Sequence, residues 1–457
     1  MSIENAISRV RDLIGDRLST SSSVRDLHGQ NEAYFKAVPP DAVAFPQTTE
    51  EVSAIVRTCN EERCPIVAWG TGTSLEGHAV PFNGGISLDM AEMSQVLAIH
   101  PEDMDAVVQP GVTREALNQE LRATGLFFPV DPGANASLGG MTATGASGTT
   151  AVRYGTMREN VMALEVVLAD GRIIRTGTRA RKSSAGYDLT KLMVGSEGTL
   201  GIITEITLRL QGQPESITAA VCPFPDMESA VNTVIATIQM GIPMARIELI
   251  DPISVKAVNE HNGMSMPEAP HLFIEFHGSE AGAKEQAETF GEIAAEYGCL
   301  GFEWSSNQEE RNRLWSARHN FYYASLKLKP GSRGLTTDIC VPISRLAEAL
   351  LETVEDIEAS GMVAPIVGHV GDGNFHVGFL VDPDNADEVE QAKALTHKMN
   401  KRSLRLGGTV TGEHGVGVGK KRYMAEEHGD AWSVMTDIKR TLDPNNILNP
   451  GKVVEIN

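Results

Sequence analysis

The sequence predicts an α+β protein that contains two domains of different pattern and a short C-terminal segment. Residues 38–214 alternate short β-rich segments with helices and carry the glycine-rich loops of the chain. Residues 215–408 place longer helices between strands, which predicts an antiparallel sheet with helices on one face. Residues 409–457 then contain a helix over 430–442, which should end at Asp443-Pro444 because proline cannot continue a helix.

An N-terminal helix and a Ser/Thr loop over 19–23 are expected within residues 1–37. Apolar residues recur at helical spacing along one stripe of this helix. Acidic residues are interspersed with its arginines and no uninterrupted apolar stretch is present, so we do not expect a signal or transit peptide. We expect the helix to pack on its own domain through Ile3, Ile7, Val10, Ile14 and Leu18.

The composition is that of an ordinary globular protein, with 41% hydrophobic and 22% charged residues in a chain of 457. The net charge of -21 disfavours nucleic acid or anionic lipid as a partner. No apolar run reaches the roughly 18 residues that a membrane-spanning helix needs. The five cysteines are scattered, which favours free thiols in a reducing compartment. We therefore expect a cytoplasmic protein, with peripheral attachment to a respiratory membrane as the alternative.

Two histidines flank a Gly-Asp-Gly-Asn turn in residues 368–376, Gly-His-Val-Gly-Asp-Gly-Asn-Phe-His. Apolar runs on both sides predict a β-hairpin whose turn centres on Asp372-Gly373. In that register residue 369 pairs with 376, and the two Cβ atoms lie roughly 5 Å apart. His369 and His376 could then chelate a divalent metal, with Glu413 as a third ligand and a position left open for substrate. The alternative is a strand turn that happens to contain two histidines.

Glycine-rich loops in the first half of the chain indicate a long, phosphate-containing ligand. Residues 69–77, Trp-Gly-Thr-Gly-Thr-Ser-Leu-Glu-Gly, lie between two strand-like runs, so their backbone N–H groups can converge on an anion. Leu75 stands where the dinucleotide fingerprint requires glycine, and no Walker motif is present. Residues 131–155 and 195–203 are also dense in small residues, which lets the backbone lie flush against a flat ligand.

Taken together, these motifs resemble those of the vanillyl-alcohol-oxidase-like flavoproteins, whose FAD-binding domain is of the PCMH type and has two subdomains. Gly-His-Val-Gly-Asp-Gly-Asn-Phe-His at 368–376, Thr-Gly-Glu-His-Gly at 411–415 and Asn-Pro-Gly-Lys at 449–452 are similar to the D-lactate dehydrogenase (cytochrome) branch. Relatives in that branch include the glycolate oxidase flavin subunit and D-2-hydroxyglutarate dehydrogenase. The resemblance implies a flavoprotein oxidoreductase with an FAD-binding domain over 38–214, a substrate or cap domain over 215–408, and a segment over 409–457 that returns to the FAD domain.

The resemblance also implies the cofactor and its contacts. We expect non-covalent FAD, because covalently flavinylated relatives have a histidine near the second glycine pair of the first loop, where this chain has Thr73. The expected metal is zinc or manganese, with iron as an alternative. The expected FAD-binding residues are Trp69, Gly70, Thr71, Gly72, Thr73, Ser74, Gly77, Pro132, Ser137, Gly140, Met141, Ala143, Thr144, Ser147, Gly148, Tyr154, Gly155, Glu197, Gly198, Ile202, Ile203 and Asn449.

Oxidising a 2-hydroxy acid requires a base for the hydroxyl proton and a cation for the carboxylate. His414 is the candidate base, since imidazole titrates near neutral pH; a role in orienting Glu413 is the alternative. Arg318 is the candidate for the substrate carboxylate and matches the family's substrate-side arginine, with a solvated arginine as the alternative. On one helix Arg318 would share a face with Tyr322, a further substrate contact together with His369 and His414.

The sequence therefore predicts FAD-dependent oxidation of a D-2-hydroxy acid, with D-lactate favoured. In D-2-hydroxyglutarate dehydrogenase a lysine precedes the Asp-x-x-x-Pro strand, whereas this chain has Leu335-Thr-Thr-Asp338. The alternatives are a glycolate oxidase flavin subunit, a D-2-hydroxyglutarate dehydrogenase and, from another class, a metallohydrolase without flavin. The expected electron acceptor is a cytochrome, a quinone or an electron-transfer flavoprotein, and a homodimer is left open.

Overall fold

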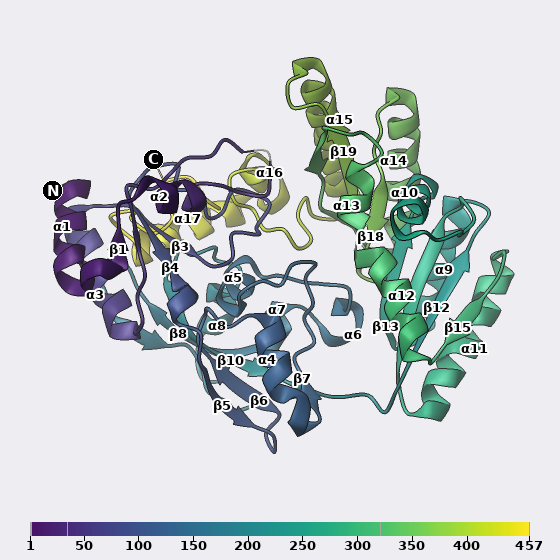
Figure 1. Ribbon diagram of the computed structural model, residues 1–457, viewed down its shortest axis with the longest axis horizontal. Coiled ribbons are helices and arrows are strands. Elements are labelled where there is room, and N and C mark those ends of the chain that lie inside the picture. The colour runs from purple at the N-terminus through teal and green to yellow at the C-terminus, as the bar shows by residue number, and fades with distance from the viewer. Residues whose placement is uncertain (1, 34, 320, 457) are drawn as a thin grey trace. The chain divides into compact units, whose positions relative to one another are not determined.

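The computed structural model describes residues 2–33, 35–319 and 321–456, without the side chains of residues 316–319, 322 and 323. It divides into two compact units. Unit 1 consists of Met1–Ser147, Gly155–Gln213 and Glu413–Asn457, and unit 2 of Gly148–Tyr154 and Pro214–Gly412 (Figure 1). The C-terminal segment thus returns to the unit that contains the glycine-rich loops.

A small sheet in unit 1 carries the first glycine-rich loop. Its strand order is β1 (Leu18–Ser19), β2 (Ala42–Ala44), β4 (Ile86–Asp89) and β3 (Ile66–Trp69), and β4 is parallel to both of its neighbours. Helix α3 (Thr49–Glu62) packs its apolar face on this sheet, and the side chain of Thr48 caps the helix by accepting from the N–H of Glu51. The loop that begins at Gly70 therefore leaves the end of a buried parallel strand.

The expected N-terminal helix is present as α1 (Ile3–Ile14) and packs on its own unit, as predicted. Ala6, Val10 and Ile14 are buried in the same core as α3, and Arg9 forms ion pairs with two glutamates of that helix. The predicted Ser/Thr loop is wrong in part, because α2 (Ser22–His28) begins at Ser22.

A second sheet of unit 1 is antiparallel throughout, in the order β5 (Val96–His100), β6 (Asp105–Val108), β10 (Ile202–Arg209), β8 (Val161–Val167) and β9 (Ile173–Arg175). A short ribbon pairs β7 (Leu126–Phe127) with β11 (Gln211–Gly212). The other α-helices described in unit 1 are α4 (Arg114–Leu121), α5 (Leu138–Thr144), α7 (Met157–Asn160), α8 (Leu189–Met193), α16 (Lys421–His428) and α17 (Asp430–Leu442). Helix α17 has the predicted bounds, and Ile447 and Leu448 beyond it are buried in the core of the small sheet.

Unit 2 is built on an antiparallel sheet, which confirms the predicted α+β class. Its strand order is β15 (Glu303–Ser305), β12 (Ser216–Pro223), β14 (His271–Gly278), β13 (Met244–Ile250), β18 (Ile366–Gly368), β19 (Asn374–Val381) and β16 (Arg333–Thr336), and β17 (Ile339–Cys340) also pairs with β19. Alternate residues of β14, such as Leu272, Ile274 and Phe276, face one core. The helices packed in that core are α9 (Met227–Gln239), α11 (Glu280–Glu296), α14 (Leu346–Ser360) and α15 (Ala386–Arg405).

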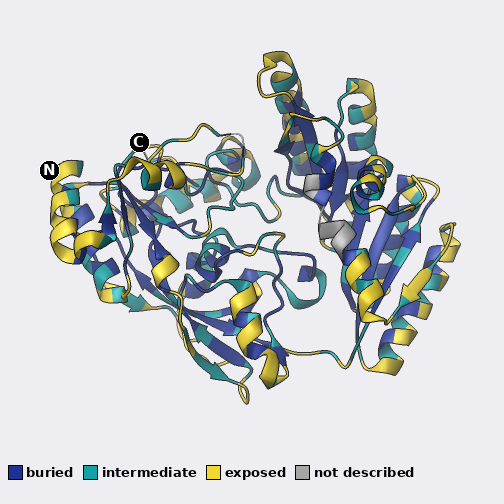
Figure 2. Cartoon of the chain, in the orientation of Figure 1, coloured by how far each residue is buried: buried dark blue, intermediate teal, exposed yellow. Residues whose placement is uncertain are grey.

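The opposite face of the sheet is also covered by helices, so the expectation of helices on one face is wrong. Phe273 and Ile250 on this face join Trp315 and Phe321 in a second cluster. The helices on this side are α10 (Pro252–Asn262), α12 (Gln308–His319) and α13 (Phe321–Leu326). Figure 2 shows the strands buried and the outer surfaces of the helices exposed. The same face carries the polar side chains of Glu248, Glu275 and His277, because they alternate with the apolar residues of the core.

Asp251 caps α10 from a buried position. Its Oδ1 accepts hydrogen bonds from the N–H of Ser254, at 2.9 Å, and from the Ser254 hydroxyl. Burial raises the pKa of the Asp251 carboxyl to about 6, although the hydrogen bonds of Ser254 and of the Ile366 backbone oppose this shift. The folded state therefore binds more protons than the unfolded state between about pH 4 and 6, and stability falls as pH rises through that window.

We expect Asp251→Asn to stabilise the protein at pH 7.5, because the amide oxygen can still cap α10 while no buried charge forms. A shift of two pKa units sets an upper limit of about 2–3 kcal/mol, so we expect a Tm increase of about 2–6 °C by calorimetry. The difference should shrink as the pH is lowered through this window and disappear below about pH 4. Asp226→Asn, at the exposed cap of α9, should give no such pH-dependent gain, and an equal gain there would contradict the explanation.

Candidate metal and cofactor site

The hairpin that carries the two histidines does not have the predicted register. Val367 pairs with His376, and Ile366 with Val377, so residue 369 is not opposite residue 376. The segment between the strands forms a short 3-10 turn, Val370–Asp372, and ends at Gly373 with φ +77°. Tertiary contacts impose this longer turn: the N–H of Val341 donates to Gly373 O at 3.0 Å, and β17 pairs with the start of β19.

The two imidazoles nevertheless lie close together, with ring centroids 5.5 Å apart in an edge-to-face arrangement. Each ring is held through Nδ1. His376 Nδ1 donates to the carbonyl oxygen of Thr337 at 3.0 Å, and His369 Nδ1 lies 2.7 Å from Oε1 of Glu248. Because both partners accept a hydrogen bond, each ring donates from Nδ1–H, and this tautomer leaves the Nε2 lone pair available for a metal ion.

The structure brings the three predicted ligands together. One ligand atom each of His369, His376 and Glu413 lies within 4.8 Å of the others. Glu413 directly follows Gly412, whose N–H donates to the backbone oxygen of Asp338 at 3.2 Å. Two neutral imidazoles and one carboxylate at this spacing fit a divalent cation with open coordination positions.

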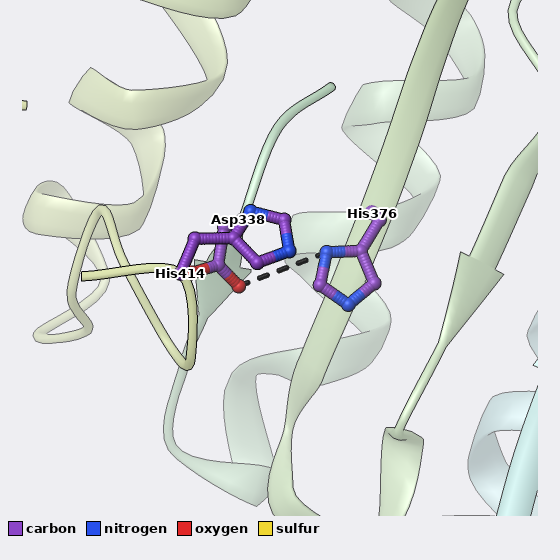
Figure 3. A group of neighbouring side chains, drawn as sticks. All are labelled: Asp338, His376 and His414. Carbon is purple, nitrogen blue, oxygen red and sulfur yellow. Dashed lines mark ion pairs between the residues drawn. The ribbon is translucent and has the colours of Figure 1, made fainter. Parts of the chain in front are cut away.

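The sequence did not identify Asp338 as a neighbour of the candidate metal ligands His369, His376 and Glu413, which we call the metal group. Asp338, His376 and His414 form a second set whose ligand atoms lie within 4.8 Å of one another (Figure 3). Asp338 is fully buried, and its two carboxylate oxygens accept from the Asn374 amide and the Thr411 hydroxyl, both at 2.9 Å. It therefore holds the segments that precede His376 and Glu413. An acidic residue inside the predicted strand 335–341 was the available signal.

Glu248 was also missed. It is fully buried on β13, and its Oε1 is the partner of His369. In the sequence it is a single acid within the apolar run Ile247-Glu-Leu-Ile250, and a buried charge in such a run needs a partner.

A polar chain extends along the same face of the sheet. The hydroxyl of Tyr154 lies 2.7 Å from Nδ1 of His277, and Nε2 of His277 lies 2.7 Å from Oε1 of Glu275. Burial raises the pKa of Tyr154. Burial also acts to raise the pKa of Glu275, but the nearby charge of Arg246 and the hydrogen bond from His277 outweigh it, so that this pKa is lowered. Tyr154 was predicted to contact FAD, and its hydroxyl is directed into this chain.

The predicted cofactor residues of unit 1 gather around α5. A Cβ on Gly70 would overlap the Ser137 hydroxyl, which shows how closely the first loop passes the start of α5. At the other end of α5, Ala143 O accepts from the N–H of Glu197 at 2.7 Å. Asn449 donates from its side chain to the backbone oxygen of Glu197 at 2.7 Å. Three loops that are far apart in the sequence thus meet, and this fits a ligand that is bound largely by backbone.

Some of the predicted side chains serve the fold itself. The Glu197 carboxylate accepts from the N–H groups of Val416 and Gly417 at 2.6 and 2.9 Å, with Glu197 at φ +55°. Met141, Ile202 and Ile203 are buried in the cores of unit 1. Gly148 and Tyr154 belong to unit 2. The side chains of Arg318 and Tyr322 lie outside the described residues.

The chain is similar to known proteins over its whole length. Residues 40–177 match the FAD binding domain family, and residues 213–453 match the C-terminal domain of FAD linked oxidases. It is 50% identical to "Probable D-lactate dehydrogenase, mitochondrial" of Danio rerio, over 99% of this chain and 92% of that protein. Identity to "D-lactate dehydrogenase [cytochrome], mitochondrial" of Arabidopsis thaliana is 46%, over 98% and 80%. The "Glycolate oxidase subunit GlcD" of Bacillus subtilis is 36% identical, over 91% and 89%.

Solved structures agree on the fold. The 4-ethylphenol oxidase from Gulosibacter chungangensis superposes with a TM-score of 0.78 at 18% identity, over 99% of this chain and 97% of that one. p-Cresol methylhydroxylase gives 0.77 at 18% identity, over the same shares. The chain belongs to the FAD-linked oxidases, within the group that contains the D-lactate dehydrogenases, so the predicted resemblance and the class of flavoprotein oxidoreductase are confirmed. Among the described residues, no helix is long and apolar enough to cross a membrane.

The contribution of the turn between His369 and His376 to the stability of the protein can be tested by substitution. A Cβ on Gly373 would overlap the carbonyl oxygen of Val341, and its φ of +77° is unfavourable for alanine. We expect Gly373→Ala to cost about 2 kcal/mol or more and to lower the Tm by about 4–8 °C. Gly378→Ala, on β19, is the control, because a Cβ there meets nothing within 4 Å. Equal Tm values for the two variants would contradict the role of this turn.

Proposed function

We propose that this protein is an FAD-dependent dehydrogenase that oxidises D-lactate to the 2-oxo acid with the help of a divalent metal ion. The observation that carries the proposal is the group of His369, His376 and Glu413, whose ligand atoms lie within 4.8 Å of one another. It occurs in a chain whose relatives along nearly its whole length include proteins named D-lactate dehydrogenase. Both imidazoles have Nδ1 engaged, and this is the state that a metal ligand needs.

In this proposal, FAD and the metal ion supply the redox and Lewis-acid chemistry, and side chains of the protein hold the ion and accept the proton. Bound FAD supplies the acceptor for the hydride, and a bound divalent ion lowers the pKa of a hydroxyl on it. His369, His376 and Glu413 would hold the ion, which we expect to be zinc or manganese. His414, adjacent to a ligand, would take the hydroxyl proton. The flavin is held without a covalent bond, since Thr73 offers no imidazole for attachment.

A monocarboxylate is favoured by the residues before Asp338. Thr337 and Asp338 are fully buried, and the Thr337 hydroxyl accepts from the N–H of Val377 at 2.9 Å. No lysine stands in residues 335–338 to hold a second carboxylate, so D-2-hydroxyglutarate is disfavoured. Arg318 remains our candidate for the single carboxylate of the substrate, with Tyr322 beside it.

A second candidate is the flavin subunit of a glycolate oxidase complex, which the 36% identity to the Bacillus subtilis subunit supports. A flavin-free metallohydrolase is disfavoured by membership in the FAD-linked oxidases. Electrons would leave the flavin for a cytochrome, a quinone or an electron-transfer flavoprotein, and the first is favoured by the name of the relative from Arabidopsis thaliana.

The function is tested by mixing the oxidised holoprotein anaerobically with 2-hydroxy acids and following the flavin absorbance. We expect D-lactate to bleach the flavin and L-lactate to leave it oxidised. D-2-hydroxyglutarate should react at least about tenfold less efficiently, the equivalent of about 1.4 kcal/mol. A preference for glycolate, with turnover only when a partner is added, would support the second candidate. If no D-2-hydroxy acid bleaches the flavin, the proposal is wrong.

Replacing Glu413 should affect metal binding, whereas replacing its neighbour His414 should affect the rate of flavin reduction. Glu413→Ala removes a negative ligand, so the metal content should fall and activity with it. His414→Ala should retain metal and flavin while slowing flavin reduction roughly 10²–10⁴-fold, with little change in substrate affinity. Metal analysis and stopped-flow reduction of both variants make the comparison. Loss of metal from His414→Ala but not from Glu413→Ala would reverse the two roles.

A further inference from the structure

We propose that Glu248 is a positioning residue for the metal site, whose carboxylate orients His369 and strengthens its bond to a divalent cation. The inference rests on the metal step of the proposed function and extends it to a residue on a different strand. The contact is direct, with 2.7 Å between Oε1 of Glu248 and Nδ1 of His369. His369 is partly buried, and Glu248 is completely inaccessible to solvent.

The two histidines differ in the group that lies at hydrogen-bond distance from Nδ1. His376 donates to the carbonyl oxygen of Thr337 at 3.0 Å, with the Asp338 carboxylate farther away at 3.7 Å, whereas the Glu248 carboxylate lies 2.7 Å from Nδ1 of His369. A carboxylate that accepts from Nδ1–H fixes the tautomer and makes Nε2 more basic, so the metal bond becomes stronger. A backbone carbonyl fixes the tautomer but supplies no net charge.

A purely structural role explains Glu248 poorly. Its neighbours Ile247 and Leu249 are buried in the main core of unit 2, and an apolar residue would be less costly at an inaccessible position between them. Arg246, on the same face of β13, lies 3.7 Å from Glu275 and stacks 4.7 Å from the Trp315 ring. A cation bound to His369 would contribute to offsetting the cost of burying the Glu248 carboxylate.

Glu275 offers a matched control. It is buried on the same face of the adjacent strand, and Arg246 pairs with it in the sheet register. Its carboxylate contacts His277, a residue outside the metal group. Glu275→Gln therefore removes the same charge at nearly the same depth without touching His369.

The experiment measures the affinity of the holoprotein for Zn²⁺ and Mn²⁺ after dialysis against a chelator, by competition with a fluorescent chelator. Retained FAD absorbance and the Tm report the fold. We expect Glu248→Gln to weaken the Kd about 10–100-fold, with FAD content unchanged, and Glu275→Gln to stay within about threefold of the wild type. If Glu248→Gln does not fold, Glu248→Asp replaces it, since that variant keeps the charge but withdraws it from Nδ1, and it should also bind the ions more weakly.

The outcomes separate this inference from the proposed function. If the wild-type protein binds neither ion, the metal step of the proposed function fails and this inference fails with it. If the wild type binds an ion and the Glu248 variants bind it equally well, only the role of Glu248 is overturned. A similar loss of affinity in Glu275→Gln would also overturn it, because the effect would then reflect buried charge in general.

Discussion

The geometry of the candidate metal ligands His376 and Glu413 depends on the buried carboxylate of Asp338. Its Oδ1 accepts from Asn374, two residues before His376, and its Oδ2 accepts from Thr411, two residues before Glu413. Its backbone oxygen accepts from Gly412. A single side chain thus joins two segments that lie far apart in the sequence, and a rotation of either segment would break a buried hydrogen bond, at a cost of about 1–3 kcal/mol. The positions of His376 and Glu413 follow from this constraint.

Glu197 acts in a similar way on the residues after His414. Its carboxylate accepts from two successive N–H groups, those of Val416 and Gly417, and a Cβ on Gly415 would lie 2.8 Å from Oε1 of this glutamate. Its own backbone is tied to Ala143 and Asn449. The loop that carries Glu413 and His414 is therefore held by buried carboxylates before and after the pair. Loops fixed in this way keep catalytic groups in place without relying on regular secondary structure.

The pKa values of two buried carboxyl groups in unit 2, those of Asp251 and Glu275, shift in opposite directions because their neighbours differ. At Asp251 burial is the dominant influence, opposed by neutral donors alone, and the pKa rises to about 6. Glu275 is also buried, but a guanidinium and an imidazole lie beside it and its pKa is lowered. Burial alone therefore does not decide the charge of a carboxylate in this protein; the nearest cation does.

The local pattern of apolar, glycine and proline residues was enough to predict several features of this protein. These are the helix over 430–442, the apolar stripe of the N-terminal helix, the antiparallel sheet of unit 2 and the residue types of the candidate metal and cofactor motifs. These features depend on side-chain periodicity and on proline or glycine at fixed positions, so nearby residues suffice. The register of His369 and His376, the helices on both faces of the sheet, and the partners Asp338 and Glu248 were decided by tertiary structure alone. Each depends on contacts between distant residues, such as Val341 with Gly373 and Glu248 with His369, and local periodicity carries no information about them.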